Sequence, residues 1–432
     1  MTMNAAKRDC IWRPFTQMLN AEPPLMVRSG NGVFLELEDG KKIVDCISSW
    51  WVNLHGHARK EIADAIAEQA NKLEQVIFAG FTHEPAEKLA ERLLTHLPSN
   101  LKHVFYSDNG STAVEVALKL AFQYWLNNGK KKNKFIAFEG GYHGDTAGSM
   151  SIGQGSPFWN TFEPLLFSIE LAPFPSTFDN DSFVQEKESR SLNRLKEILD
   201  KDGDNIAAIC IEPLIQGAGG MRFCRPQFLK DLRALCNQHE VLLIFDEVMT
   251  GFGRTGDWFA ACRADVQPDL ICISKGITGG FLPLSVTACS STIFDAFLST
   301  DHSKTFFHGH SYTANPLACA AAIASMDLLE SDPTVFSAME ARHKTFMNKH
   351  IKDHPRLIQQ RVCGTIFAAE IQSKEEDSYF NSVAPILKKR FIEKGFLIRP
   401  LGNTVYLMPP YCIDDDILEA AYKVIAKCCA SI

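Results

Sequence analysis

The sequence has no segment long and apolar enough to cross a membrane. A spanning helix needs about 18 consecutive apolar residues, and no run in the 432 residues approaches that length. The opening stretch, Met1 to Trp12, mixes charged and apolar side chains and has no continuous apolar core of the kind found in secretory leaders. We therefore expect a cytoplasmic protein with no membrane partner.

Basic residues are also in the minority, with 44 Lys and Arg against 51 Asp and Glu and a formal net charge of −7. The one dense basic run, Lys130 to Lys134, contains no aromatic residues and follows Asn127, Asn128 and Gly129, which is typical of a solvated turn. Nucleic acid is not an expected partner, because binding to it depends on clustered Lys and Arg.

Paired cysteines and metal-ligand motifs are missing as well. None of the 13 cysteines forms a C-x-x-C pair, and their odd number favours buried free thiols in a reducing compartment over disulfides or zinc. His55 with His57, and His308 with His310, could suggest metal ligands, but no acidic or cysteine partner stands at ligand spacing. We predict turn histidines and no metal site.

What the sequence does contain is a repeated strand-then-helix pattern, which predicts a parallel sheet covered by helices on both faces. The expected strands are 103–107, 134–139, 206–212, 241–246, 270–274 and 284–290. Helices are expected at 61–74, 84–97, 111–128 and 226–240. The predicted fold class is α/β, with a large domain built on a mostly parallel sheet and a smaller α+β domain.

The chain divides into three parts on this pattern. Residues 1–60 form an N-terminal arm with a hairpin, in which Asp39-Gly40 supplies the positive φ angles of a two-residue turn. Residues 61–330 form the large domain. Residues 331–432 form the small domain, with short strand-like runs at 362–371, 396–400 and 405–408, and it is expected to pack with the arm.

Two predicted strands end in side chains suited to cofactor chemistry. One ends in Asp246, and another is followed directly by Lys275. Ligands of open α/β sheets bind at the carboxyl ends of the strands. Pyridoxal 5'-phosphate needs a lysine to form a Schiff base and an acid to keep its pyridine nitrogen protonated. A lysine there can also be merely a solvated strand end. A strand ending in Asp246-Glu247 also suits a magnesium-dependent nucleotide hydrolase, but the phosphate loop G-x-x-x-x-G-K-[ST] is absent.

A candidate phosphate site lies at Ser107 to Ser111 (SDNGS), where a strand turns into a long helix. Backbone N–H groups at a helix N-terminus attract phosphate, and Gly110 permits a close backbone approach. The segment could also be an ordinary helix cap, and the two interpretations are compatible. Tyr142 lies in a glycine-rich loop after another strand, where it is either presented to a ligand or packed in the core.

Together these residues resemble the class III, fold-type I pyridoxal-phosphate aminotransferases. The family's signature corresponds to Asp246 to Gly256 (DEVMTGFGRTG), followed by Ser274-Lys275-Gly276. The resemblance implies that the catalytic residues are Lys275, Asp246 and Tyr142. Lys275 would carry the cofactor, Asp246 would contact its pyridine nitrogen, and Tyr142 would stack on its ring. Gly110 and Ser111 would bind its phosphate.

Over nearly its whole length the chain is similar to the branch of this family that acts on 8-amino-7-oxononanoate in biotin biosynthesis. The matching segments are 12–17, 48–51, 141–145, 216–220, 308–309, 315–319, 398–400 and 407–410. The resemblance implies substrate contacts by Phe15, Trp50, Trp51, Tyr142, Lys275, Gly309 and Arg399. Arg399 would pair with the substrate carboxylate, although it could also form a routine salt bridge.

The resemblance also implies a partner subunit. Gly309, His310 and Ser311 match a segment that in relatives reaches the cofactor phosphate of the neighbouring subunit. A homodimer with shared active sites is therefore expected.

The sequence has features of relatives that use two different amino donors, S-adenosylmethionine and lysine. Relatives that use S-adenosylmethionine usually carry Tyr where this chain has Phe15, and Pro-Thr where it has His310-Ser311. Those two departures resemble a lysine-using branch, whereas the second aromatic residue of Trp50-Trp51 does not. We favour S-adenosylmethionine, with lysine as the alternative.

Two other functions are compatible with parts of this pattern. Another class III transaminase could act on an ω-amino acid or ornithine with 2-oxoglutarate, and Trp50-Trp51 argues against it. A regulator without catalysis would have to retain Asp246, Lys275 and the phosphate site by accident.

Overall fold

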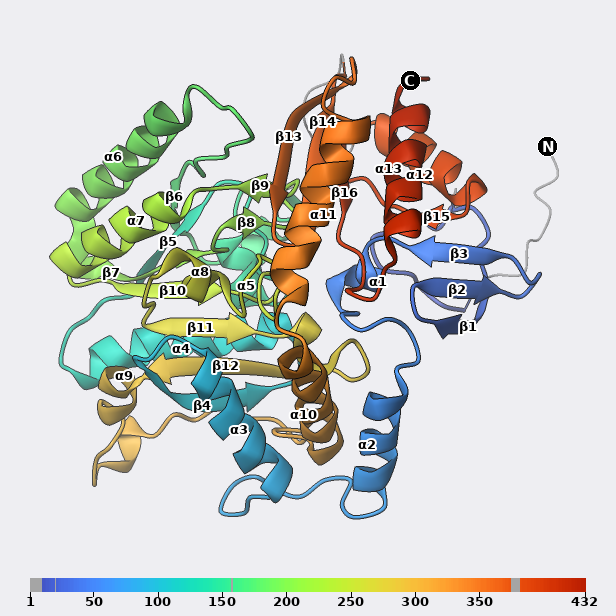
Figure 1. Cartoon of the computed structure of the whole chain (residues 1–432). Helices are drawn as coiled ribbons and strands as arrows, with labels where there is room; N and C mark the ends of the chain where they lie inside the picture. Colours follow the sequence, from blue (N-terminus) through green and yellow to red (C-terminus); the bar gives the residue numbers. More distant parts are fainter. Residues whose placement is uncertain (1–9, 20, 157, 374–380) are drawn as a thin grey trace.

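The computed structural model describes residues 10–19, 21–156, 158–373 and 381–432 (Figure 1). Within them, seven strands form the central sheet in the order β4-β12-β11-β10-β7-β5-β6. Among these, β12 alone is antiparallel to its neighbours, β11 and β4, and the other pairings are parallel. The predicted α/β class with a mostly parallel sheet is confirmed.

The sheet strands agree with the sequence prediction to within one or two residues. They are β4 Leu101–Ser107, β5 Lys134–Phe138, β6 Glu170–Ala172, β7 Ile206–Ile211, β10 Leu242–Asp246, β11 Leu270–Ile273 and β12 Ser285–Ser290. The edge strand β6 was not predicted, because three residues give no recognisable alternation.

Helices cover both faces of the sheet, as Figure 1 shows. Alternate strand residues belong to different cores, so Cys210 packs on the side of α4 (Gly110–Asn127) and Ile209 on the opposite side. That second side is covered by α3 (Glu84–His96), α6 (Val184–Asp202) and α7 (Pro226–Gln238). The helices α2 (Lys60–Ala70) and α10 (Pro316–Ser331) pack against each other beside the sheet.

A second sheet joins the two ends of the chain. It contains β1 (Val27–Asn31), β2 (Phe34–Leu37), β3 (Lys42–Asp45) and β15 (Phe396–Leu397), and β15 runs parallel to β3. The predicted hairpin is present as β2–β3, but its connection spans the four residues 38–41 and only Gly40 has positive φ (+81°). The two-residue turn was therefore wrong in length.

The C-terminal part is built on a third sheet of β13 (Leu357–Cys363), β14 (Ile366–Ile371) and β16 (Thr404–Leu407). Helices α11 (Val335–His350), α12 (Val383–Glu393) and α13 (Asp415–Cys429) lie around it. The single strand expected at 362–371 is wrong. Gly364 (φ +56°) turns the chain there, and a side chain at this position would stand 2.2 Å from the Gly256 nitrogen. The domain boundaries at residues 60 and 330 stay predictions.

Arg254, in the loop after β10, connects the central sheet with segments from the N-terminal and C-terminal parts of the chain. It is 1% exposed, and its Nη1 and Nη2 donate to the carbonyls of Pro409 (3.1 Å) and Asn53 (3.2 Å). The loop after β10 is thereby held against segments from both ends of the chain. This arrangement places residues 51–53 and 409–411 near the carboxyl end of β10 in the central sheet.

Across the described residues, none of the helices has both the length and the apolar character that a membrane crossing demands. The thirteen cysteines, all within the described residues, are free thiols, and most are buried.

Candidate active site

A cavity of about 460 Å³ opens at the carboxyl ends of the central strands, a size suited to a small ligand. Its lining includes Asp246 at the end of β10 and Lys275 directly after β11. Gly110 and Ser111 come from the start of α4, and Tyr142 from the loop after β5. The structure thus brings together the five residues that the sequence placed at this edge.

Lys275 combines an unusual backbone conformation with a buried amine. Its backbone has φ +43°, and its Nζ lies 4.8 Å from the centroid of the Trp51 ring. Burial of the amine lowers the pKa of Lys275, although the negative charges of Asp246 and Glu212 oppose the shift. Among the described residues no hydrogen bond or ion pair engages this amine. A buried amine without such a partner is suited to act as a nucleophile and base.

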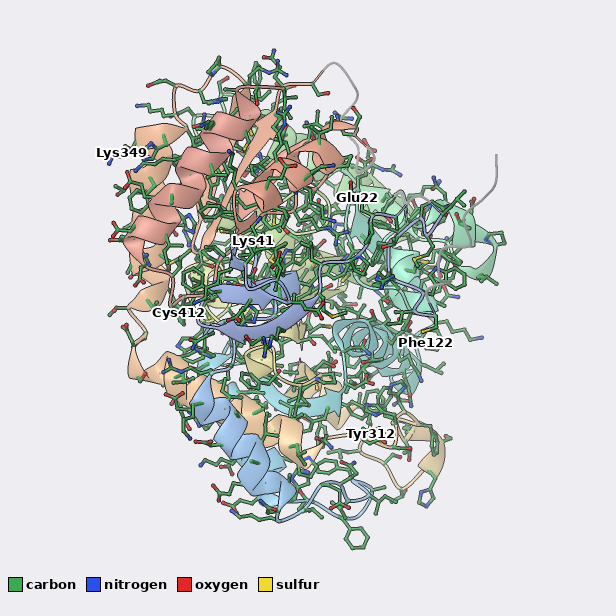
Figure 2. The ribbon with its side chains drawn as sticks, turned by 90° about the vertical axis from the view of Figure 1, so that its right-hand side faces the viewer. Glu22, Lys41, Phe122, Tyr312, Lys349 and Cys412 are labelled. Atoms are coloured by element: carbon green, nitrogen blue, oxygen red, sulfur yellow. The ribbon has the colours of Figure 1, made fainter. Side chains whose placement is uncertain are left out.

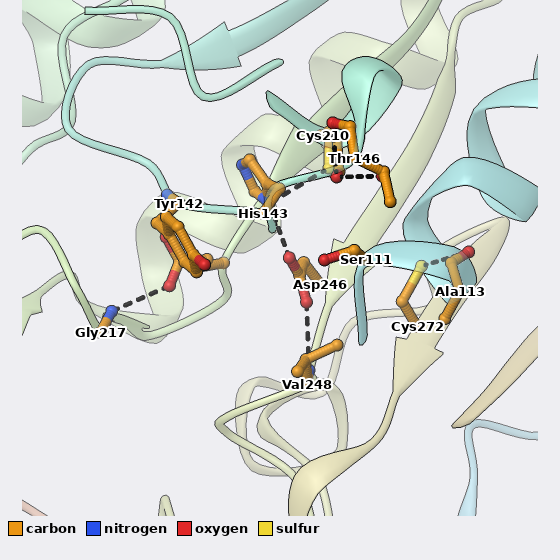
Figure 3. A network of polar contacts seen from close by, with 12 residues as sticks. Ser111, Ala113, Tyr142, His143, Thr146, Cys210, Gly217, Asp246, Val248 and Cys272 are labelled. Carbon is orange, nitrogen blue, oxygen red and sulfur yellow. Dashed lines mark hydrogen bonds and ion pairs between the residues drawn. The ribbon is translucent and has the colours of Figure 1, made fainter. Parts of the chain in front are cut away.

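Asp246 is held from two sides in a buried polar network (Figure 3). Its Oδ2 lies 2.6 Å from His143 Nδ1, and its Oδ1 accepts a hydrogen bond from the Val248 N–H at 3.1 Å. Cys210 Sγ is 4.0 Å from the same imidazole nitrogen. Burial alone would lower the pKa of His143, but Cys210 and Asp246 outweigh it and raise that pKa above its ordinary value. The Asp246 side chain therefore lines the cavity in an orientation fixed by the His143 imidazole and the Val248 N–H.

Glu212 is a cavity residue to which the sequence assigned no role. It follows β7, is 6% exposed, and accepts hydrogen bonds from the N–H groups of Tyr142 (2.9 Å) and Gly217 (2.8 Å). Burial raises the pKa of Glu212 to about 7. Its position at the end of a strand neighbouring β10 was the available signal, since Asp246 was found by the same criterion.

The start of α4 is shaped for an anion. Asn109 caps the helix through its side chain, which accepts from the Thr112 N–H at 3.1 Å. Any side chain at Gly110 would stand 2.6 Å from Val248, and one at Gly144 would stand 1.9 Å from the Ser111 hydroxyl oxygen. The glycines leave the backbone N–H groups of the helix start beside the cavity. The helix cap is present, and the phosphate site at Gly110 and Ser111 stays a prediction.

These features fit pyridoxal phosphate. The cavity offers an amine for its aldehyde, a fixed carboxylate for its ring nitrogen and a helix N-terminus for its phosphate. Tyr142 adds an aromatic ring, which packs edge-on against Phe158 at 5.9 Å and donates a hydrogen bond to Asp145. The described residues hold no cluster of His, Cys, Asp and Glu that could bind a metal ion.

A second cavity, of about 540 Å³, adjoins the first and shares Trp51, Tyr142 and Lys275 with it. Its walls are mainly aromatic and aliphatic, and its cations are Lys275, Lys388 and Arg399. The full lining is Phe15, Ile47, Ser49, Trp50, Trp51, Tyr142, Phe158, Ala218, Lys275, Lys388, Leu397, Arg399, Leu401 and Tyr406. Phe15, Trp50 and Arg399, predicted from the sequence as substrate contacts, are therefore together. Lys388 was missed, because a lysine pair on an amphipathic helix is normally a solvated surface.

The tryptophan pair has two distinct environments. Trp51 is 4% exposed and donates from Nε1 to the Tyr406 hydroxyl at 2.9 Å. Trp50 is 42% exposed, and the Arg399 guanidinium lies 4.9 Å from its ring centroid. Both belong to the short helix α1 (Ser48–Trp51), in which Ser48, Ser49 and Trp51 have positive φ. Such strained backbone is commonly retained at ligand sites.

Gly309, His310 and Ser311 lie in the linings of neither of these cavities. The Tyr312 N–H donates to His310 Nδ1 at 3.2 Å, within their own loop. Figure 2 shows Tyr312 well apart from Glu22, which lies beside α12. Within one chain the structure therefore does not bring these three residues to the site.

Comparison with known proteins gives consistent results. The family model described as Aminotransferase class-III matches residues 17–429. The adenosylmethionine-8-amino-7-oxononanoate aminotransferase of Synechococcus elongatus is 52% identical over 96% of this chain and 97% of its own length. The enzyme of the same name from Anoxybacillus flavithermus is 42% identical over 95% of this chain and 92% of its own.

Solved structures agree with these relatives. The adenosylmethionine-8-amino-7-oxononanoate aminotransferase of Methanocaldococcus jannaschii superimposes with a TM-score of 0.90 at 33% identity, covering 98% of this chain and 97% of that one. A PLP-bound amine transaminase from an uncultivated Pseudomonas species gives a TM-score of 0.89 at 30% identity, covering 98% of both chains.

Proposed function

The chain belongs to the class III aminotransferases, and from this premise we propose that its amino acceptor is 8-amino-7-oxononanoate and its product 7,8-diaminononanoate. The proposed amino donor is S-adenosylmethionine, and the proposed cofactor is pyridoxal phosphate. The relatives at 52% and 42% identity carry these substrates in their names. The reaction would serve biotin biosynthesis.

The choice of acceptor rests on the lining of the two cavities that meet at Lys275. A cavity with aromatic and aliphatic walls, and with Arg399 in its lining, meets the cofactor-sized cavity at Lys275. The proposed acceptor has an apolar chain with a carboxylate at one end and a ketone six carbons away. Apolar walls suit the chain, a guanidinium suits the carboxylate, and the reacting carbon would lie near Lys275.

Pyridoxal phosphate, when bound, supplies an electron-accepting ring that stabilises the negative charge left on a carbon that loses a proton. Lys275 would hold its aldehyde and Asp246 its ring nitrogen. Gly110 and Ser111 would hold its phosphate, and Tyr142 would lie against its ring.

Lys275 has a second role in this proposal. With the cofactor bound, the Lys275 side chain would lie beside the reacting carbon, in a position to take up and return the proton. Burial lowers the pKa of this lysine, which favours the neutral amine required of a base. The nearly buried Trp51 ring, 4.8 Å from the amine, limits access of water on that side.

Both substrates would use the same site in turn. Each carries a carboxylate, so Arg399 can bind either one. Phe15, His310 and Ser311 depart from the pattern of relatives that use S-adenosylmethionine, whereas Trp51 follows it. The names of the relatives support S-adenosylmethionine over lysine.

We also propose a cytoplasmic homodimer in which Gly309, His310 and Ser311 reach the partner's phosphate site. Support comes from their loop, which lies outside the linings of both cavities and carries two strongly exposed aromatic residues, Phe307 (75%) and Tyr312 (66%). Apolar exposure of this kind is typical of an interface.

The test is the absorbance of the cofactor-loaded protein on addition of S-adenosylmethionine, lysine or glutamate singly, without the ketone. A spectral change with S-adenosylmethionine alone is expected, followed by its reversal when 8-amino-7-oxononanoate is added. A change with lysine only would place the protein in the lysine-using branch. A change with glutamate only would favour an ω-amino acid transaminase. Lys275→Ala serves as the control and should not convert the bound cofactor to its amine form with any donor.

A further inference from the structure

The second cavity contains two cations from different elements. Lys388 lies on α12, and Arg399 follows β15. Lys388 is exposed at the rim, whereas Arg399 is half-buried with its guanidinium over Trp50. The family's resemblance explains Arg399, but it assigns nothing to Lys388.

Neither cation is neutralised within the part of the chain that the structure describes. No hydrogen bond or ion pair to an acid engages either side chain there. The acid that bears on Lys388 is Glu22, and Glu22 is bound to the neighbouring Lys389 at 3.4 Å. Partial desolvation of its amine at the cavity rim and the nearby Arg399 both lower the pKa of Lys388. Two like charges that share one cavity repel each other, and a bound anion would remove that repulsion.

The walls indicate the kind of anion. The lining between these cations and Lys275 is aromatic and aliphatic, with Phe15, Trp50 and Leu397 among its members. Such walls would bind a carbon chain and would offer few hydrogen bonds to a polyanion such as a phosphate ester. A carboxylate at the end of an apolar chain satisfies both parts of the cavity.

We propose that Lys388 and Arg399 together form the carboxylate-binding end of the second cavity, with Lys388 a specificity-determining residue for the amino acceptor. This inference rests on the proposed function for the identity of the natural ligand. Arg399 fixes the carboxylate through its planar pair of donors, and Lys388 adds a second point charge from α12. The pair favours a chain ending in a carboxylate over an equally long neutral chain.

Binding of an unreactive probe tests the pair without relying on turnover. The probe is nonanoate, and 1-nonanol is its neutral counterpart, each titrated calorimetrically into the cofactor-loaded protein. Lys388→Gln should raise the Kd for nonanoate about 3- to 10-fold, because one partly screened charge contact is lost. Its Kd for 1-nonanol should not change. Arg399→Gln should weaken nonanoate binding further.

Lys389→Gln is the matched control, because Lys389 adjoins Lys388, pairs with Glu22 and is absent from the cavity lining. This variant should bind nonanoate as the wild type does. The inference is overturned if Lys388→Gln also binds nonanoate like the wild type, or if it loses affinity for nonanoate and 1-nonanol equally.

Kinetics separate this inference from the proposed function. With 8-amino-7-oxononanoate, Lys388→Gln should raise KM about 3- to 10-fold and leave kcat unchanged, because it removes binding that ground state and transition state share. If the wild type does not turn over this ketone, the proposed acceptor is wrong. The nonanoate titrations still decide whether Lys388 and Arg399 act as a pair.

Discussion

The two cavities that meet at Lys275 are built in contrasting ways. In the first, the acidic groups are already paired, since Asp246 is held by His143 and Val248, and Glu212 by two backbone N–H groups. In the second, Lys388 and Arg399 have no acidic partner among the described residues, and the remaining walls are mainly apolar.

The difference is consistent with the proposed function, in which the first cavity holds the cofactor and the second the substrates. A cofactor that remains in place can be met by groups whose orientation is fixed in advance, which avoids reorganisation during the reaction. A site that binds two unlike substrates in turn needs charged side chains that are not already paired with other residues of the protein. Residues on strand ends suit the first requirement, and side chains from the N-terminal arm and the C-terminal part suit the second.

The largest effect is expected at the point where the cavities meet. Lys275→Ala should lower kcat by at least about 10³-fold, because it removes the side chain proposed as both nucleophile and base. Steady-state kinetics with the purified variant measure the loss, and urea unfolding checks that the fold is retained. Retention of more than a tenth of wild-type turnover would mean that another group performs the chemistry.

Glu212→Gln tests whether burial in the first cavity raises the pKa of Glu212. Since burial raises the pKa of Glu212 to about 7, the folded protein keeps this proton to higher pH than the unfolded chain does. Stability relative to Glu212→Gln should therefore fall as pH rises from about 4.5 to about 7, by on the order of 3 kcal/mol in total.

Urea unfolding of the cofactor-free wild type and the Glu212→Gln variant at pH 5, 6, 7 and 8 measures this difference. Parallel curves for the two proteins would show that Glu212 ionises at an ordinary pH.

His143 tests the fixed pairing of the first cavity. His143→Phe should lower kcat/KM by about 10- to 100-fold, the usual range for partners that orient a functional group. His143→Asn, which can still donate a hydrogen bond to Asp246, should retain more activity. Equal activity of the Phe variant and the wild type would show that Asp246 does not depend on its partner.

The smallest effect is expected at the wall between the cavities, which consists of Trp51 and its hydrogen-bond partner Tyr406. Tyr406→Phe removes the acceptor of the Trp51 Nε1–H bond and should destabilise the protein by about 1 kcal/mol. Tyr411→Phe is the matched control, since its hydroxyl donates to the Phe252 carbonyl and it lines neither of these cavities. Thermal unfolding should show similar losses, but only Tyr406→Phe should raise KM. A KM increase in both variants would count against a specific role for the wall.

The first cavity was also the easier one to foresee. Asp246 and Lys275 stand at the ends of continuous apolar runs, so their sequence positions fix their place on the sheet edge. Glu212 ends a run of the same kind, but Pro213 and the absence of a motif around it left it unassigned. The α/β class followed from the same alternation of strands and helices.

The second cavity was foreseen only in part. Phe15, Trp50 and Arg399 came from resemblance, because residues so distant in sequence carry no local signal of proximity. Lys388 could not be found in this way, since its exposure on α12 matches that of any surface lysine. The strand expected at 362–371 failed because Gly364 turns the chain against the backbone of Gly256, a contact invisible in local pattern.

The pairing of β3 with β15 has a consequence for how the protein is made. Val44 lies opposite Phe396, so one edge of β3 has no partner until residue 396 has left the ribosome, about 350 residues after β3. During synthesis at roughly 5 to 20 residues per second, an unpaired strand edge stays open to other chains for tens of seconds. Slow translation between β3 and β15, or a shortage of chaperones, should therefore reduce the yield of native protein without any change in the active-site residues.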